Sequence, residues 1–417
     1  MLRESWGVCK PLSVVRHLCY ERPMNSFNGT NIGTNKKIIV GMSGGVDSSV
    51  TAAVLKEQGH EVIGLFMKNW EEEDENGVCK ASLEYADVIK VCEKLDIPYY
   101  SVEFVKEYRD NVFKYFLEEY EAGHTPNPDI LCNREIKFKV FFEKAMELGA
   151  DYLATGHYCQ NLIINGKSQL VKGVDARKDQ TYFLYTMQEK ILEKVLFPIG
   201  HIEKSEVRAI AEKYNLATKA KKDSTGICFI GERNFKNFLS QYVQMKAGDF
   251  ESLDGTVVGK HDGAAYYTIG QRKGLGLGGQ GEPWFVVDKD IERNVVIVER
   301  GERHPALYAD ELWANELSFV DPDFFKNLEM PLKLKAKVRY RQPDQDCTLM
   351  SIENGVAHVV FDSPQRAIAI RQSLVLYQDR DGQRVCLGGG MIKERGSTYD
   401  ERNISLPDGN LDGLTNT

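Results

Sequence analysis

The stretch IIVGMSGGVDSS, residues 38–49, places a short apolar strand, a glycine loop and the first turn of a helix in direct succession. Gly59 is the expected stop of this helix, and a further apolar strand is expected over residues 62–67. The alternation continues, with helices expected over 83–95 and 108–121 and strands over 99–104 and 152–155. This pattern is typical of a parallel sheet with helices on both faces, so we predict a doubly wound α/β domain. In such a sheet the glycine loop lies at the carboxyl end of the first strand, where ligands bind.

The glycine loop has the residue types that a bound phosphate requires. Gly44 and Gly45 allow the backbone to approach a phosphate closely, and the following helix directs unpaired N–H groups toward it. Ser43, Ser48 and Ser49 add hydroxyl donors. The loop is not a Walker A motif, because no lysine follows the last glycine. The alternative is a plain glycine turn, which we consider weaker because strand, SGGVDS and helix occur in the required order. The motif resembles that of the PP-loop ATP pyrophosphatases, which split ATP into AMP and pyrophosphate.

The chain of 417 residues exceeds what one hydrophobic core usually supports, so several domains are expected. After residue 234 short strands and glycine turns replace the α/β pattern, and beyond residue 310 alternating strands favour a small β-barrel or sandwich. We predict five segments: a disordered N-terminal extension (1–36), a PP-loop catalytic domain (37–235), a small central domain (236–305), a C-terminal β-barrel (306–395) and a disordered tail (396–417).

The composition is that of a globular protein, with 42% hydrophobic and 27% charged residues. No apolar run approaches the roughly 18 residues of a membrane helix, and residues 1–36 resemble neither a secretory signal nor a transit peptide. We therefore predict a cytoplasmic protein with no membrane partner. The net charge of -8 neither indicates nor excludes RNA binding, which would depend on local basic patches. The nine cysteines form no CxxC pair, and we interpret EEEDE at 71–75 as a solvated loop, so we predict no protein metal site.

The stretch TPNPDILCNREIKF, residues 125–138, predicts a helix with Asn127 as N-cap and Pro128 at its first position. Cys132 then lies in the early turns, where the helix dipole lowers the pKa of a thiol from its free value of about 8.5. Asp129 falls on the same face and could transfer a proton. The alternative is a cysteine packed as a small hydrophobic residue, the usual fate of this residue type. We favour the reactive interpretation because cap, carboxylate and thiol converge here.

A second cysteine, Cys228, lies in KKDSTGICFIGE, residues 221–232, where a basic and hydroxyl-rich loop leads into an apolar stretch. Taken alone this is weak support for a catalytic role, because an isolated cysteine in such a strand is more often part of the core. The sequence does not tell whether Cys228 meets Cys132.

Taken together, these motifs resemble the tRNA-specific 2-thiouridylase family over roughly residues 37–395. The strings that carry the resemblance, in family order, are GMSGGVDSS, LFMKNWEEED, TPNPDILCNREIKF, LATGHY, KDQTYFL, KKDSTGICFIGE, GQRKGLGLGG, VRYRQ and CLGGG. The resemblance implies an adenine nucleotide alpha hydrolase-like fold and 2-thiolation of uridine 34 in the tRNA anticodon. ATP, with Mg²⁺, adenylates the C2 oxygen, a persulfide on Cys228 supplies sulfur, and Cys132 completes the transfer and is left in a disulfide with Cys228. The implied partners are tRNA and a persulfide donor protein of a cysteine desulfurase relay.

The resemblance also assigns site residues. Those implied for ATP are Gly41, Met42, Ser43, Gly44, Gly45, Val46, Asp47, Ser48, Met67 and Gly156, with Asp47 near the pyrophosphate and its magnesium ion. Those implied for the target base are Asn127, Pro128 and Asp129, and those implied for other parts of the tRNA are Lys178, Asp179, Gln180, Tyr340, Arg341 and Gln342. His157 is interpreted as structural or as part of the nucleotide pocket.

The stretch PLKLKAKVRYR, residues 331–341, has a cation at every second position. On a strand Lys333, Lys335, Lys337, Arg339 and Arg341 would share one face and could contact phosphates. The alternative is a solvated edge strand that uses lysine to resist aggregation.

Two rival functions remain at this point. A PP-loop ligase or amidotransferase acting on a small molecule would need the ATP loop but neither cysteine, and a noncatalytic RNA-binding module would not need the intact SGGVDS loop.

Overall fold

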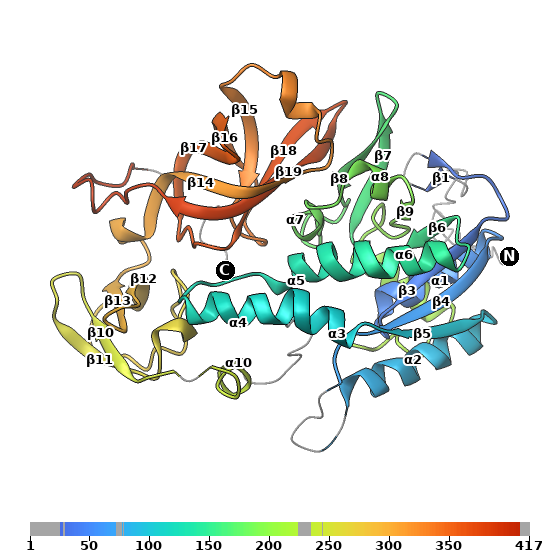
Figure 1. Cartoon of the computed structure of the whole chain (residues 1–417), viewed down its shortest axis with the longest axis horizontal. Helices are drawn as coiled ribbons and strands as arrows, with labels where there is room; N and C mark the ends of the chain where they lie inside the picture. The colour runs from blue at the N-terminus through green and yellow to red at the C-terminus, as the bar shows by residue number, and fades with distance from the viewer. Residues whose placement is uncertain are drawn as a thin grey trace, which may run out of the picture.

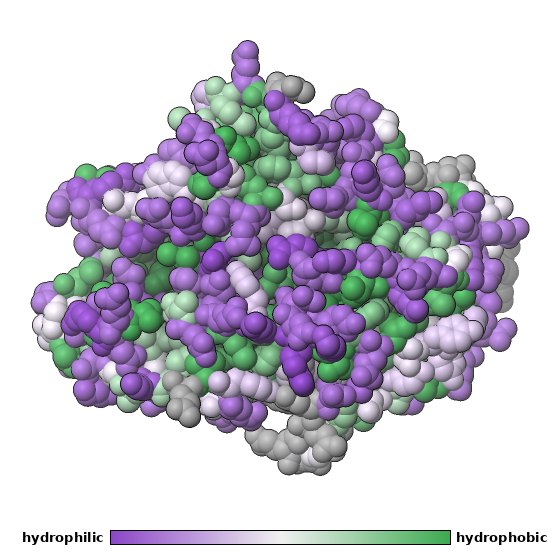
Figure 2. Space-filling model, viewed as in Figure 1, coloured by the Kyte–Doolittle hydropathy of each residue, from purple (hydrophilic) through white to green (hydrophobic). Residues whose placement is uncertain are grey.

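The computed structural model of the chain describes residues 26–27, 30–71, 77, 79–223, 235–243 and 245–408. Figure 1 shows an α/β region at the right, a small central β-module at the lower left and a C-terminal barrel at the upper left. Hydrophilic residues cover much of the face drawn in Figure 2, with hydrophobic residues scattered between them. Within the described ranges, no helix combines the length and the apolar character that crossing a bilayer requires.

The α/β region is organised around a parallel sheet in the order β5-β4-β3-β6-β9. Its strands are β3 (Lys37–Met42), β4 (Glu61–Lys68), β5 (Tyr99–Glu103), β6 (Tyr152–Ala154) and β9 (Val195–Leu196). Every neighbouring pair is parallel. Ile38 and Val40 of β3 pack into the core on one face, whereas Ile39 packs into the core on the other. The doubly wound parallel sheet predicted from the sequence is therefore confirmed.

Helices cover both faces of this sheet. The first core contains side chains of α1 (Val46–Glu57), α2 (Lys80–Leu95) and α9 (Lys204–Lys213), and the second contains side chains of α6 (Phe141–Glu147). Helix α1 ends at Glu57, and Gly59 follows with a φ of 80°, as expected of a glycine that stops a helix.

Two long helical stretches lie between β5 and β6. The first consists of α3 (Val105–Tyr108), a π-helical turn η1 (Arg109–Phe113) and α4 (Lys114–Glu121). The second consists of α5 (Pro128–Leu131), a wider π-helical segment η2 (Cys132–Val140) and α6. Residues 122–127 connect the two stretches, which lie next to each other in Figure 1.

The C-terminal region is a closed antiparallel barrel. Its strands are β14 (Tyr308–Phe319), β15 (Leu332–Lys337), β16 (Gln345–Glu353), β17 (Val356–Arg366), β18 (Ser373–Arg380) and β19 (Gln383–Arg395). Pairing of β14 with β19 closes the ring, which confirms the predicted barrel. A hairpin of the α/β region, β7 (Cys159–Ile164) and β8 (Lys167–Lys172), extends the same sheet, because Val171 pairs with Val385 of β19.

The central module has a four-stranded sheet in the order β11-β10-β13-β12. Its strands are β10 (Gly248–Glu251), β11 (Val257–His261), β12 (Trp284–Asp290) and β13 (Val295–Arg300). The remaining short elements are β1 (Ser26–Phe27), β2 (Thr30–Asn31), α7 (Thr181–Leu184), α8 (Glu189–Leu192), α10 (Phe235–Leu239) and the 3₁₀ turns Ala264–Tyr266, Pro305–Leu307 and Phe324–Asn327.

The prediction of a disordered tail is wrong for residues 396–408. Thr398 is 2% exposed and Tyr399 is 9% exposed, and the Tyr399 amide donates to the Tyr308 carbonyl. The Tyr399 ring joins an apolar cluster with Phe285 of the central module. Because the tail is mostly polar, its composition did not indicate that Tyr399 packs into an apolar cluster. The prediction of a disordered extension over residues 1–36 is wrong for the part that the structure describes, residues 26–27 and 30–36, because β1 pairs with β2 and Ile32 is 7% exposed. Residues 1–25, 28–29 and 409–417, also predicted to be disordered, lie outside the described residues.

Candidate active site

The glycine loop leads into α1 without a side-chain cap. Gly45 is the N-cap residue, and no side chain of the described residues accepts a hydrogen bond there. Ser43 and Ser48 instead bond to each other, with 3.2 Å between their hydroxyl oxygens, and Ser49 donates to the Gly45 carbonyl at 2.7 Å. Because first-turn amides without a side-chain cap carry the positive end of the helix dipole, the arrangement is suited to an anion.

Two glycines allow close packing around the loop. Gly44 has a φ of 70°, and a Cβ there would lie 2.6 Å from the Glu84 carbonyl oxygen. Gly156 follows β6, and a Cβ on it would lie 2.8 Å from both the Asp47 carbonyl carbon and the Ser48 nitrogen. The structure thus brings Gly156 against the loop, as expected if both border one ligand.

Other residues predicted to contact ATP lie deeper in the fold. Met42 and Val46 are buried in the core between β3 and its helices, and Gly41 faces the Phe141 ring. Met67 is half-buried near the end of β4. The side chains of Met42 and Val46 pack in the core beneath the loop. A ligand bound on the loop would therefore contact mainly backbone atoms.

Two lysines from distant parts of the sequence flank the loop. Lys204, the first residue of α9, donates to both carboxylate oxygens of Asp47 at 2.7 and 2.9 Å. Lys221 donates to the Gly44 carbonyl at 2.9 Å and pairs with Asp87 at 3.0 Å. Sequence reasoning missed both, since they follow the loop by well over a hundred residues and only the tertiary fold brings them there. Both ammonium groups therefore lie beside the loop, each paired with a carboxylate.

Asp223 extends this cluster toward a segment predicted to contact tRNA. Lys204 contacts Asp223 at 2.9 Å, and Lys178 and Arg208 contact it at 2.8 and 2.7 Å. Burial raises the pKa of Asp223, but hydrogen bonds from Lys178 and Lys204 outweigh burial and lower the pKa to about 2. Lys204 therefore bridges two carboxylates, Asp47 and Asp223.

The helix that carries Cys132 begins as predicted. The Asn127 side chain accepts a hydrogen bond from the Asp129 amide at 3.2 Å, and Pro128 occupies the first position. Cys132 is 3% exposed and belongs to an apolar cluster that includes Phe116. This burial agrees with the alternative of a packed cysteine as well as with a shielded nucleophile. Cys228, the second predicted thiol, lies outside the described residues, as does most of EEEDE at 71–75.

A chain of contacts joins this helix to the glycine loop. Asn133, next to Cys132, accepts from Lys137 at 2.7 Å, and the Lys137 ammonium lies 3.4 Å from Nε2 of His157. His157 adjoins Gly156, which packs on the loop. Burial and then Lys137 lower the pKa of His157 well below its ordinary value, so the imidazole is neutral and links the two parts of the site.

The chain is similar to known proteins over most of its length. Three domain models match consecutive parts of the chain: a tRNA methyl transferase HUP domain over residues 36–232, a tRNA methyl transferase PRC-barrel domain over 236–300 and an aminomethyltransferase beta-barrel domain over 309–392. A protein of Protochlamydia amoebophila named tRNA-specific 2-thiouridylase MnmA is 61% identical over 89% of this chain and 97% of its own length. The chain belongs to the tRNA-specific 2-thiouridylase family. Proteins of the same name from Bacillus subtilis and Listeria monocytogenes are 56% and 58% identical over 86% and 85% of the chain, and over 95% and 94% of their own lengths.

The two segments predicted to contact tRNA meet through aromatic rings. The Tyr340 ring lies 4.3 Å from that of Phe183, just after the Lys178 segment. Asp179 is 2% exposed, and its carboxylate accepts hydrogen bonds from the Gly173 amide and from the Thr181 hydroxyl. In this conformation the buried carboxylate therefore stabilises the Lys178 segment.

The neighbouring residues differ in whether their side chains are hydrogen-bonded within the protein or exposed to solvent. Gln180 accepts from the Tyr158 amide at 2.9 Å, and Gln342 accepts from the Val338 amide at 3.0 Å. Arg341 is exposed. Of the six residues assigned to tRNA beyond the target base, Arg341 therefore has the side chain best placed to reach a phosphate without rearrangement.

The prediction that five cations share one face of a strand is wrong. Strand β15 ends at Lys337, which is buried, so the alternation does not continue to Arg341. Arg339 turns inward and donates to the carbonyls of Ala367 and Ile269 at 2.8 and 2.6 Å, which connects the barrel to the central module. Lys333 and Lys335 pair with Asp362 and Asp346. The alternative of an edge strand is also wrong, because β15 pairs with β16 on one side and with β18 on the other.

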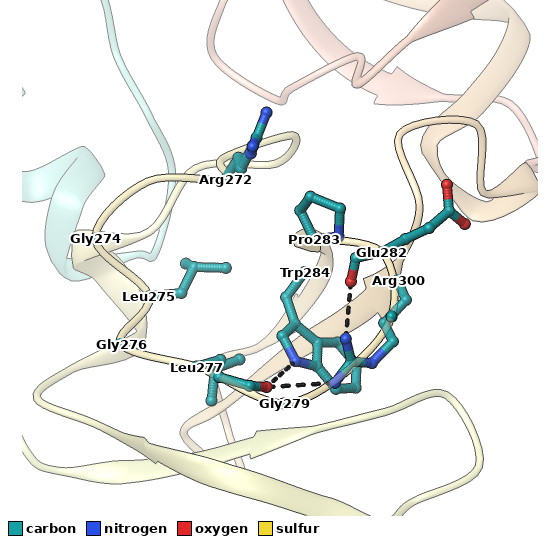
Figure 3. A pocket seen from close by; sticks show the side chains of 12 residues that line it. Arg272, Gly274, Leu275, Gly276, Leu277, Gly279, Glu282, Pro283, Trp284 and Arg300 are labelled. Atoms are coloured by element: carbon teal, nitrogen blue, oxygen red, sulfur yellow. Dashed lines mark hydrogen bonds between the residues drawn. The ribbon is translucent and has the colours of Figure 1, made fainter.

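The QRKGLGLGG stretch, residues 271–279, has a turn at 273–274 and no helix or strand, and it borders a cavity of about 340 Å³ in the central module. Arg300 lies 4.2 Å over the Trp284 ring and donates to the carbonyls of Glu282 and Gly278 at 2.8 and 3.3 Å (Figure 3). No residue of the glycine loop or of the Cys132 helix lines this cavity, so it is separate from the site described above.

Proposed function

We propose that this chain uses ATP to adenylate the C2 oxygen of uridine 34 in a tRNA anticodon and then replaces that oxygen by sulfur. The observation that carries the proposal is the contact chain from the Cys132 helix through Lys137 and His157 to Gly156 beside the glycine loop. An activated base must meet both a phosphate site and a thiol, and this chain of contacts holds the two parts in one framework.

ATP would place its phosphates on the uncapped start of α1, with Lys204 and Lys221 as counter-charges. Mg²⁺ is commonly held by one or two carboxylates together with substrate phosphates, and Asp47 at the loop fits this mode. No group of three or more potential metal ligands occurs among the residues that the structure describes, so the phosphates would supply most ligands. When bound, the ion would neutralise charge on the departing pyrophosphate.

The chemistry follows from leaving groups and nucleophiles. A carbonyl oxygen leaves poorly, whereas AMP leaves readily and takes the C2 oxygen with it. The terminal sulfur of a Cys228 persulfide attacks C2 after losing its proton. The Cys132 thiolate then attacks the Sγ of Cys228, the S–S bond breaks, and its electron pair stays on the transferred sulfur as AMP departs. A Cys132–Cys228 disulfide remains, and an external thiol must reduce it before the next cycle. Asp129, two residues past the Asn127 cap, would handle a proton beside the base.

The remaining assignments are part of the same proposal. Asn127, Pro128 and Asp129 would contact the target base, and Lys178, Asp179, Gln180, Tyr340, Arg341 and Gln342 would contact other parts of the tRNA. A persulfide donor protein would load Cys228, and the cytoplasm is the expected location. We also propose domain boundaries at 37–235, 236–305 and 306–395, which the membership of the three main sheets supports apart from the β7–β8 hairpin.

The direct test is incubation of the purified chain with ATP, a persulfide donor and unmodified tRNA, with thiolated RNA detected by its retardation on a mercury-containing gel. We expect thiolation that depends on ATP and releases AMP and pyrophosphate. Methylated tRNA in place of thiolated tRNA, or product formed without ATP, would overturn the proposal.

Lys204 gives a prediction about the ATP step. Lys204→Met removes the cation that bridges Asp47 and Asp223, so we expect the KM for ATP to rise about tenfold or more. Lys213→Met, on the same helix, removes a mostly exposed lysine paired with Glu57 and is the matched control. The rate of pyrophosphate release, measured over a range of ATP concentrations, gives the KM for ATP of each variant. An unchanged KM in Lys204→Met would show that this cation does not serve the phosphates.

Arg341 gives a prediction about RNA. Arg341→Glu should weaken tRNA binding about tenfold at low salt and reduce the salt dependence of the affinity by about one phosphate contact. Lys333→Glu is the matched control, because it reverses the charge of a mostly exposed lysine beside Asp362 on the barrel. Filter binding over a range of salt concentrations measures the effect. Equal affinity and equal salt slope in wild type and Arg341→Glu would rule out a phosphate contact at Arg341.

A further inference from the structure

Residues 123–125 lie within the connection from α4 to α5, and Thr125 is two residues before the Asn127 cap of the Cys132 helix. This connection is short, yet side chains from both the central module and the barrel hold it. Lys289, Thr268 and Gln372 contact these residues directly, and Arg371 contacts them through Glu119 and His124; we call these four residues the 123–125 clamp.

The central module contacts the connection at two points. Lys289 of β12 donates to the Gly123 carbonyl and, at 2.9 Å, to the Tyr267 carbonyl. Burial lowers the pKa of Lys289 to about 8, as expected of an ammonium group enclosed by protein. The Thr268 and Thr125 hydroxyl oxygens lie 3.3 Å apart. The central module thus contacts both Gly123 and Thr125.

The barrel contacts the same connection from the loop that precedes β18. Gln372 donates its side-chain amide to the Thr125 carbonyl at 2.6 Å. Arg371 pairs with the buried Glu119 at 3.1 Å, and Glu119 in turn lies 2.6 Å from the His124 ring. Arg371 has a φ of 67°, an uncommon backbone conformation for a residue with a side chain, which its packed neighbours maintain.

We propose that Gln372 and Thr268 are positioning residues that hold residues 123–125 so that Asp129 and Cys132 are aligned for sulfur transfer; the assignment rests on the function proposed above. The reasoning is geometric. The Asn127 cap begins two residues after Thr125, so a shift of the connection moves the start of the helix. Reacting groups tolerate little displacement, and a shift of about 1 Å can cost about 100-fold in rate. The barrel and the central module thereby take part in the chemical step without touching the base.

The first measurement separates kcat from KM. Gln372→Met keeps the length of the side chain but removes the donor to Thr125, and we expect kcat for thiolation to fall about tenfold with KM for ATP and tRNA within about twofold of wild type. Gln160→Met is the matched control, because Gln160 donates in the same way to the Lys172 carbonyl at 2.7 Å, within the β7–β8 hairpin. A change in KM alone, or an equal loss in both variants, would overturn the positioning role.

The second measurement does not depend on catalysis. Hydrogen–deuterium exchange of a peptide covering residues 121–131 should be faster in Gln372→Met and in Thr268→Val than in wild type, and unchanged in Gln160→Met. Thr268→Val keeps the side-chain shape, so it tests the clamp even if Gln372→Met folds poorly. Unchanged exchange in a folded clamp variant would overturn the inference, and so would faster exchange with normal kcat. A wild-type chain that fails to thiolate tRNA would instead contradict the proposed function, and exchange would still show whether the clamp exists.

Discussion

Replacing Cys132 by serine is expected to lower formation of 2-thiouridine by roughly 1,000-fold or more, because a hydroxyl cannot cleave the persulfide bond at neutral pH. The adenylation step needs the glycine loop and not this thiol. We therefore expect release of pyrophosphate dependent on tRNA to continue in Cys132→Ser. Comparing thiolated RNA with pyrophosphate from the same reactions measures both effects at once.

Cys79→Ser is the control for this substitution. Cys79 is half-buried at the N-cap of α2, so serine suits its position and thiolation should be normal. If Cys132→Ser kept even half of the thiolation, Cys132 would be a packed core residue, the alternative that its burial also allows. Loss of both pyrophosphate release and thiolation would instead show that Cys132 is required for the fold.

Gly156→Ala should impair ATP use about 100-fold in kcat/KM. The added methyl group would lie 2.8 Å from the backbone of Asp47 and Ser48, closer than real contacts of a Cβ, so the start of α1 or the strand end must move. Backbone amides bind a phosphate only when they are aimed at it, and a shift of about 1 Å is enough to lose about 100-fold. Initial rates of pyrophosphate release over a range of ATP concentrations measure the effect.

Gly278→Ala provides the comparison, since a Cβ there meets no atom within 4 Å. Its rates and its melting temperature should equal those of wild type. A Gly156→Ala variant with normal kcat/KM for ATP would mean that the contact between β6 and the loop does not shape the phosphate site. A large fall in melting temperature would show that the clash affects the whole fold, and the kinetic loss would then not be specific to ATP.

The sequence was sufficient to predict elements that local patterns control. The apolar run before Gly41, the glycine loop and the stop at Gly59 predicted the strand, loop and helix that the structure has. Asn127 and Pro128 predicted the start of the Cys132 helix for the same reason, because capping depends on a few adjacent residues. Alternation predicted a small β-barrel or sandwich, and the choice between them was settled by the pairing of β14 with β19, which depends on tertiary contacts.

Other features depended on contacts between distant residues. The alternating cations of residues 333–341 suggested a single face, but the strand ends at Lys337 and Arg339 is drawn inward by two carbonyl groups. Lys204 carries no local signal, because only the packing of α9 beside α1 brings it to Asp47. A tail of polar composition hid Tyr399, whose ring is enough to anchor the segment.

The β7–β8 hairpin has a consequence for how the chain can be divided. Because Val171 pairs with Val385, the N-terminal region and the barrel share a continuous hydrogen-bonded sheet. A fragment ending after the central module would expose β8 as an unpaired edge and would uncover Tyr182, whose hydroxyl donates to the Ser373 carbonyl. Such edges recruit other chains, so the fragment would aggregate instead of folding alone. Gene truncation or fusion of this protein must therefore keep the barrel, and melting of the two regions should occur as one transition.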